Sequence, residues 1–260
     1  MDTTRDWLVT LWIGEDPGAV ERACLQSAVR HGHRVALYCY RAPATPIPGV
    51  EIRDAAAILP EDKIIRYRNG SVALFSNWFR YELMRHDVGM WIDADLYFVA
   101  PLDTRPDWIV GMQDRKMANM AVLKTPPDAP ILDDLLAPFE RGARPAGLSL
   151  RQRATLLRRR LRGERVTLAD MPWGVTGPNA LTVLLRRHGL MGLALPSEVL
   201  SPVPYLQADW VLRPDVALED VVRPGTVAVH LWNELIKPHK DKPAPAGSFL
   251  ERLQREGAAA

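Results

Sequence analysis

The sequence predicts one α/β domain with a mostly parallel central sheet and an arginine-rich helical insertion. A continuous apolar run from Trp7 to Ile13 is typical of a buried parallel strand. A helical pattern and a second apolar run follow it, which is the strand–helix–strand order of α/β folds. The 260 residues are 47% hydrophobic and 25% charged, enough to bury the core of one domain. No repeat or low-complexity linker divides the chain, so residues 1–260 are predicted to form a single domain.

The first half of the chain alternates between predicted strands and helices. Gly14 ends the first strand, and Asp16-Pro17 starts a helix whose apolar positions recur at helical spacing. Ser71 is the predicted N-cap of the second helix, which carries an apolar stripe formed by Phe75, Phe79 and Leu83. The predicted strands are residues 7–13, 34–40 and 50–53.

The second half begins with a predicted strand over Gly89–Asp95. A loop rich in glycine and proline, residues 172–179, precedes a helix that ends near residue 188. The chain ends with a proline-rich tail over residues 240–260, which contains a short helix from about Ser248. The other predicted elements are a strand at 96–100, apolar stretches at 108–112 and 117–123, helices at 131–140 and 150–161, and a strand at 226–232.

Two carboxylates, Asp93 and Asp95, stand at the end of the strand predicted at 89–95. If the strand persists through Asp95, its period of two residues places both acids on one face. The carboxylates repel each other there, and a hard divalent cation such as Mg²⁺ or Mn²⁺ relieves the repulsion and can clamp a diphosphate. The alternative is a solvated turn, in which such pairs also occur.

Residues 141–165 form a basic segment with nine arginines and a single acid, Glu164. The segment has a charge of +8, against +2 for the whole chain. Two interpretations of it stay open. Its apolar stripe either packs on the domain with the arginines in solvent, or docks on the surface of an anionic membrane. Nucleic-acid binding is not expected, because no recognition motif accompanies the arginines. The stripe consists of Leu150, Ala154, Leu157 and Leu161.

Five segments together resemble glycosyltransferase family 32, a group of sugar transferases with an Asp-x-Asp motif. They span most of the chain: Leu11–Gly14, Phe75–Tyr81, Gly89–Asp95, Thr176–Pro178 and His230–Asn233. Their order and spacing are similar to those of bacterial polysaccharide-type transferases and, more distantly, of the glucosylating domain of large clostridial toxins. The resemblance implies a GT-A fold, a Rossmann-like domain that binds a nucleotide sugar, and transfer with retention of anomeric configuration.

The resemblance also implies which residues bind the donor. Trp12 would stack on the nucleobase, a contact of about 1–3 kcal/mol, unless it is a core residue. The Arg80 guanidinium would bind phosphate and sugar oxygens, unless it is a solvated helix charge. The family usually has aspartate where this chain has Asn77, which puts donor preference or rate in question. The full donor-binding set is Trp12, Gly14, Ser76, Asn77, Arg80 and Asp93.

The metal ligands implied by the resemblance are Asp93, Asp95 and His230, holding Mn²⁺ or Mg²⁺. For His230 the alternative is a core residue, because a lone histidine at the end of an apolar strand is often satisfied inside the protein. Trp232 would lie near the diphosphate, where its indole N–H can donate. The residues expected to serve catalysis are Asp93, Asp95, Arg80 and Trp232.

The predicted function is metal-dependent transfer of a sugar from a nucleoside diphosphate to a hydroxyl of a glycan or lipid-linked acceptor, in the assembly of surface polysaccharide or glycolipid. The alternative is a catalytically weak nucleotide-sugar-binding relative, motivated by Asn77. P-loop hydrolysis and dinucleotide redox chemistry are not expected, because neither glycine-rich motif is present. An aspartyl phosphotransferase is not expected either, because its Asp-x-Asp usually follows the first strand.

The start of the chain lacks the basic region and apolar run of a secretion signal. No apolar run approaches the roughly eighteen residues of a membrane span. We therefore expect a cytoplasmic protein, held peripherally on the inner face of the membrane if residues 141–165 dock there.

Overall fold

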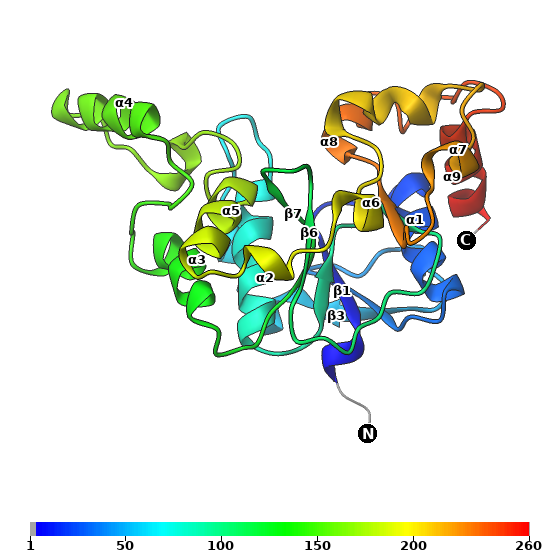
Figure 1. The fold of residues 1–260 in the computed structure, drawn as a ribbon, viewed down its shortest axis with the longest axis horizontal. Coiled ribbons are helices and arrows are strands. Elements are labelled where there is room, and N and C mark those ends of the chain that lie inside the picture. The colour runs from blue at the N-terminus through cyan, green and yellow to red at the C-terminus, as the bar shows by residue number, and fades with distance from the viewer. Residues whose placement is uncertain (1–3, 260) are drawn as a thin grey trace.

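The computed structural model describes residues 4–259, so residues 1–3 and 260 of the predicted domain lie outside the described residues. A mixed six-stranded sheet forms its centre, in the order β3-β2-β1-β4-β7-β6 (Figure 1). The strands that run parallel to one another are β1 (Leu8–Trp12), β2 (Val35–Cys39), β3 (Val50–Asp54) and β4 (Met90–Ile92). The antiparallel additions are β7 (Ala118–Lys124) beside β4 and β6 (Ile109–Met112) beside β7. The predicted α/β fold with a mostly parallel sheet is confirmed.

A second, two-stranded sheet joins distant parts of the chain. β5 (Leu96–Phe98) pairs antiparallel with β8 (Ala228–His230). The register places Leu96 opposite His230. The end of β8 therefore lies beside the residues that follow β4.

Helices cover both faces of the central sheet (Figure 1). The helices α2 (Ala73–Arg85), α3 (Pro130–Glu140) and α5 (Pro178–Arg187) share an apolar cluster with Val9 and Trp91. The neighbouring strand residues Leu8 and Met90 instead join a cluster with α1 (Ala19–Arg30). This alternation is the two-residue period of a strand buried on both faces. The C-terminal helix α9 (Phe249–Ala258) packs against α1, with Gly257 so close to Ala19 that no side chain would fit.

Two helices begin later than the sequence predicts. α1 begins at Ala19 with Gly18 as its N-cap, because the Asp16 carboxylate accepts the backbone N–H groups of residues 44 and 45 in the neighbouring loop. α2 begins at Ala73 with Val72 as its N-cap, so Ser71 is not the cap. The Ser71 hydroxyl still accepts the Ala73 N–H, 3.3 Å away.

Several short helices are absent from the sequence prediction. They lie in the region between α5 and α9, where the chain forms one or two turns at a time around the second sheet. They are α6 (Ser197–Leu200), the 3₁₀ segment η6 (Tyr205–Leu212), α7 (Leu218–Val221) and α8 (Asn233–Ile236). Segments this short have too few residues to show a helical period.

The helix α4 (Leu150–Leu161) extends away from the rest of the molecule, at the upper left of Figure 1. Ser149 caps it by accepting the Gln152 N–H. Leu156 attaches α4 to a small apolar cluster, whereas the predicted stripe does not pack: Leu150 is 83% exposed, Leu157 51% and Leu161 78%. The interpretation that this stripe packs on the domain is therefore wrong. No helix within residues 4–259 combines the length and apolar character needed to cross a membrane.

Candidate functional site

The order of the central sheet reverses between β1 and β4. From β1 the chain adds β2 and β3 on one side, then returns through α2 to place β4 on the other side of β1. In open α/β sheets, ligands bind outside the carboxyl ends of the strands at such a switch point. The parallel register pairs Val9 with Trp91, so Trp12 at the end of β1 lies at the same edge as Asp93 and Asp95 after β4.

Asp93 and Asp95 lie in a turn between β4 and β5, so the prediction of a strand through residue 95 is wrong. β4 ends at Ile92, and the Leu96 N–H donates to the Asp93 carbonyl 3.3 Å away. The Asp93 N–H donates to the carbonyl of Ala121 on β7 at 2.7 Å. Attachment to the sheet on one side and to β5 on the other fixes the turn. The two carboxylates approach each other through the turn and not through strand alternation.

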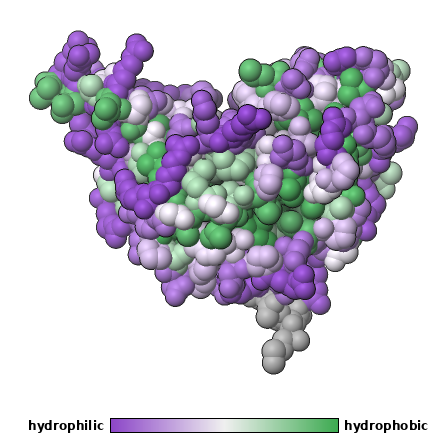
Figure 2. Space-filling view, viewed as in Figure 1, coloured by the Kyte–Doolittle hydropathy of each residue, from purple (hydrophilic) through white to green (hydrophobic). Residues whose placement is uncertain are grey.

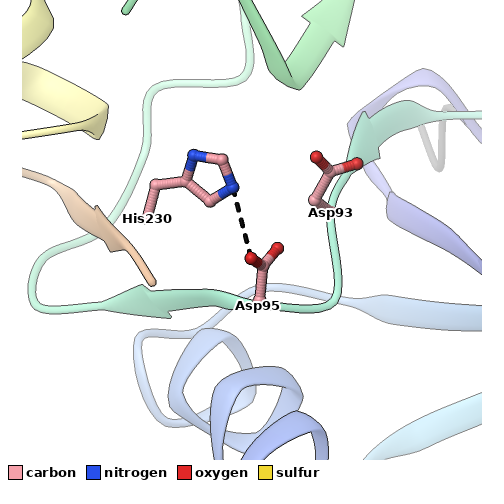
Figure 3. Close-up of side chains that lie close together, drawn as sticks. All are labelled: Asp93, Asp95 and His230. Carbon is pink, nitrogen blue, oxygen red and sulfur yellow. Dashed lines mark ion pairs between the residues drawn. The ribbon is translucent and has the colours of Figure 1, made fainter. Parts of the chain in front are cut away.

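Asp95 is paired with His230 from β8 (Figure 3). Oδ2 of Asp95 lies 3.3 Å from Nε2 of His230, and each side chain is only 9% exposed. The same oxygen accepts the backbone N–H of Asn233 at 2.7 Å. Trp232, which precedes that amide, has a left-handed backbone with φ 58°, a conformation uncommon for a bulky residue. The strained residue therefore stands directly before an amide that holds the carboxylate.

The pair shifts two pKa values in opposite directions. Burial alone would raise the pKa of Asp95, but the charge of His230 and the hydrogen bonds to the carboxylate outweigh burial and lower it. Burial alone would lower the pKa of His230, but the attraction of Asp95 outweighs burial and raises it. A proton on Nε2 is thereby stabilised, and a cation that binds both side chains has to replace it.

Asp93 is held by two donors on one oxygen. Its Oδ1 accepts the Trp91 indole N–H at 2.8 Å and pairs with a guanidinium nitrogen of Arg80 at 3.1 Å. Arg80 is 6% exposed, lies 4.4 Å from the Trp91 ring centre and donates to the Met120 carbonyl. The interpretation of Arg80 as a solvated helix charge is therefore wrong. Within residues 4–259, Oδ2 of Asp93 accepts no hydrogen bond. Figure 3 shows Asp93 across from His230, with Asp95 below the two.

The three side chains fit a divalent cation. One ligand atom from each of Asp93, Asp95 and His230 lies within 4.8 Å of the others, and oxygen with imidazole nitrogen suits Mn²⁺. Oδ1 of Asn233 is buried and has no hydrogen-bond partner among the described residues, while the backbone N–H of the same residue donates to Asp95. A buried acceptor without a donor costs about 1–3 kcal/mol. The residue that holds Asp95 therefore also carries an unpartnered acceptor.

Asn119 on β7 forms a hydrogen bond with Nδ1, the other ring nitrogen of His230. Its amide nitrogen lies 3.2 Å from Nδ1 of His230 and donates to Ser201, while its oxygen accepts the Ala121 N–H at 2.7 Å. These contacts orient the amide so that it donates to Nδ1, which leaves the ring proton on Nε2. His230 can bind a cation through Nε2 only after that proton leaves. Asn119 therefore influences whether His230 is a metal ligand.

Ser76 and Asn77 differ in their surroundings. The Ser76 hydroxyl accepts a guanidinium N–H of Arg80 at 3.0 Å. Because Arg80 also pairs with Asp93, this hydroxyl lies near the group of Asp93, Asp95 and His230, which we call the acidic cluster. Asn77 is 7% exposed and donates to the Thr176 hydroxyl at 3.3 Å. A Cβ on Gly177 would lie 2.9 Å from the Asn77 amide nitrogen, so only glycine fits there without displacement. Asn77 thus connects α2 to the start of α5.

Trp12 and Gly14 lie at the end of β1, whereas Trp232 packs directly against His230. The indole of Trp12 is partly buried and donates to the Glu15 carbonyl, with Lys240 over its ring at 5.9 Å. Gly14 follows with φ +132°, which favours glycine. The Trp232 ring lies 4.1 Å from the His230 ring, but its indole N–H donates to the Val203 carbonyl at 2.9 Å. In this structure that N–H is not available to a diphosphate.

No family model matches the chain, and no curated protein matches it significantly. The structure itself shows an α/β domain with a mixed sheet and a group formed by Asp93, Asp95 and His230. Sequence reasoning missed Asn119 and Asn233 as parts of this site. The signal for Asn119 was available, because a lone amide inside an apolar strand usually has a buried partner.

Proposed function

We propose that the protein is a metal-dependent glycosyltransferase that moves a sugar from a nucleoside diphosphate to an acceptor hydroxyl. The observation that carries the proposal is the position of the acidic cluster, which lies at the switch point of the sheet and contains two carboxylates and a histidine. Nucleotides bind at this place in α/β folds, and a diphosphate needs compensation of its charge. The resemblance of five segments to family 32 supports the same function.

The roles of the residues follow from their contacts. Asp93, Asp95 and His230 would hold Mn²⁺ or Mg²⁺, which when bound offsets the charge that develops on the diphosphate. Arg80 is held by three elements and presents a fixed positive charge beside Asp93, suited to orient phosphate or sugar oxygens. The oxygen of Asp93 that accepts no hydrogen bond can accept one from a hydroxyl group of the donor. Trp12 is proposed to stack on the base.

The test is turnover of purified protein with Mn²⁺ against a panel of nucleotide sugars, read as release of free nucleoside diphosphate. We expect one donor to be hydrolysed slowly and to react faster with a glycan or lipid-linked acceptor. EDTA should stop the release, and Mn²⁺ should restore it. Absence of release for every donor, with a correctly folded protein, would contradict the proposal.

The second candidate is a nucleotide-sugar-binding protein without turnover. It is favoured by Asn77, which is buried against Thr176 and lacks the charge of the usual aspartate. Calorimetry separates the two functions. A binding protein would give a metal-dependent heat of donor binding and no product, whereas the enzyme gives both.

A further inference from the structure

The arm that carries α4 exposes leucines that no other part of the described chain covers. Leu150, Leu157 and Leu161 are spaced so that they share one side of the helix. Leu156, on a different side, makes the contact with the domain and is 8% exposed. The two faces of α4 therefore have separate roles, and attachment to the domain does not use the leucine stripe.

Arginines border the stripe on both sides. Arg151 and Arg158 each follow a stripe leucine directly, and Arg160 stands on the opposite border; all three are exposed. Within residues 4–259, Arg159 is the only arginine of segment 141–165 that forms an ion pair, with Glu164 and Asp170. The other positive charges of the segment are not compensated by a neighbouring carboxylate. Exposed leucine between uncompensated arginines matches a surface that has an apolar interior and anionic groups at its boundary.

A further exposed leucine belongs to a segment on the same side of the molecule as α4. Figure 1 places α4 and the gold segment η6 at the top of the view, and Figure 2 shows the surface hollowed between these two parts. Leu206 in η6 is 88% exposed, and Tyr205 beside it is 38% exposed. Figure 2 shows apolar atoms at the tip of the α4 arm and at the upper corner of the opposite lobe. One plane can touch both.

We infer that the α4 stripe and Leu206 dock on an anionic lipid bilayer, with the arginines at the level of the lipid phosphates. The stripe enters the boundary between headgroups and acyl chains, and the arginines contribute attraction that salt screens. A flat bilayer contacts both points at once, whereas a duplex of nucleic acid would use the arginines and leave the leucines in water. The inference does not depend on the proposed activity, because it concerns binding alone.

The test is cosedimentation of the full chain with phosphatidylcholine vesicles that contain or lack phosphatidylglycerol. We expect binding to the anionic vesicles at low salt, and loss of most of it at high salt. The triple variant Leu150→Ser, Leu157→Ser, Leu161→Ser should bind about tenfold or more weakly, and Leu206→Ser should weaken binding by a smaller factor. Leu193→Ser is the matched control, because Leu193 is 48% exposed but lies in another segment.

Three outcomes overturn the inference. The first is equal binding to neutral and anionic vesicles. The second is unchanged binding of the triple leucine variant, which would show that charge alone attaches the protein. The third is tighter binding of the parent to a DNA duplex than to anionic vesicles, which would identify α4 as a nucleic-acid surface. A circular dichroism spectrum that matches the parent would show that each variant is folded, and failure of the donor assay would leave the vesicle result unaffected.

Discussion

Nε2 of His230 lies 3.3 Å from Oδ2 of Asp95, although Asp95 lies in the turn before β5 and His230 ends β8, far along the sequence. The pairing of Leu96 with His230 in the β5–β8 sheet produces this contact, because it places the end of β8 against the residue that precedes β5. The acidic site is thus completed by a sheet of two three-residue strands. The position of His230 beside Asp95 depends on that pairing, just as the position of Asp93 depends on the central sheet.

Replacing Asp95 by Asn should remove the metal site and preserve the fold. The amide oxygen can still accept the Asn233 N–H, but the charge that attracts the cation is lost. We expect Mn²⁺ affinity to fall by at least about tenfold, measured by calorimetry on the parent and the variant. Asp103→Asn is the matched control, because Asp103 is exposed and pairs with Arg105 away from the site. Equal Mn²⁺ affinity in the parent and Asp95→Asn would contradict the assignment.

Asn119→Asp should strengthen metal binding through His230. A carboxylate at residue 119 accepts a hydrogen bond from Nδ1–H. This favours the tautomer in which the lone pair of Nε2 is free for the cation, as in carboxylate–histidine–metal triads. We expect Mn²⁺ affinity to rise by about tenfold above about pH 7. The added negative charge acts on the cation directly as well, so the same change is made in a His230→Ala background. An equal gain in both backgrounds would show that His230 does not bind the metal.

The amino-acid pattern was sufficient for the parts of the fold that rest on long, regular elements. The run at residues 7–13 is continuously apolar, and the stripe of α2 has a clear helical period. The structure buries residues 8–10 of the run and the whole stripe of α2. The turn at Asp93–Asp95 was not predictable, because an apolar strand entering two acids looks the same whether it continues or stops. β5 and β8 were predicted as longer strands, since their ends are fixed by each other and not by local pattern.

The sequence predicted which three side chains group together at the candidate metal site, but not the hydrogen bonds that hold them. Asp93, Asp95 and His230 do come together, and Arg80 joins them through Asp93. A lone amide in an apolar strand indicates that Asn119 has a buried partner, but the identity of that partner depends on tertiary packing. The orphan oxygen of Asn233 depends on tertiary packing as well. Trp232 shows the same limit, because its N–H is used by Val203 from a loop of irregular sequence.

His33 should make the stability of the protein depend on pH. Its Nε2 accepts the Leu102 N–H at 3.0 Å, and burial, with a smaller contribution from His31, lowers its pKa from the ordinary value of 6.5. The neutral form is the one that the fold favours. The stabilisation is therefore complete above 6.5 and is lost as the pH falls from there toward the lower pKa of the folded protein.

Urea unfolding in EDTA measures this effect. From about pH 7.5 to about pH 5.5, we expect His33 to lower the free energy of unfolding by at most the contribution of one hydrogen bond, about 1 kcal/mol. His33→Gln keeps an acceptor that does not titrate, so the loss should be smaller in that variant by this amount. If the parent and His33→Gln lose stability in parallel over the range, the histidine does not act as an acceptor in the fold.

Asn77→Asp should change the choice of donor without changing metal affinity. The two side chains have the same shape, and the Thr176 hydroxyl can donate to a carboxylate at residue 77 as readily as it now accepts from the amide. The resemblance to glycosyltransferase family 32 implies a sugar-contacting aspartate at this position, and a charge-assisted hydrogen bond to a sugar hydroxyl contributes about 1.5–3 kcal/mol. If that contact strengthens in the transition state, relative kcat/KM among donors should shift by about tenfold or more. The direction depends on whether the pocket is fitted to the amide, but the ranking should change in either case.

Asn69→Asp is the matched control, because Asn69 is exposed and accepts only the Ser71 N–H. A donor panel and a Mn²⁺ titration on the parent and both variants complete the comparison; unchanged ranking and rates for Asn77→Asp would show that this residue only connects α2 to α5.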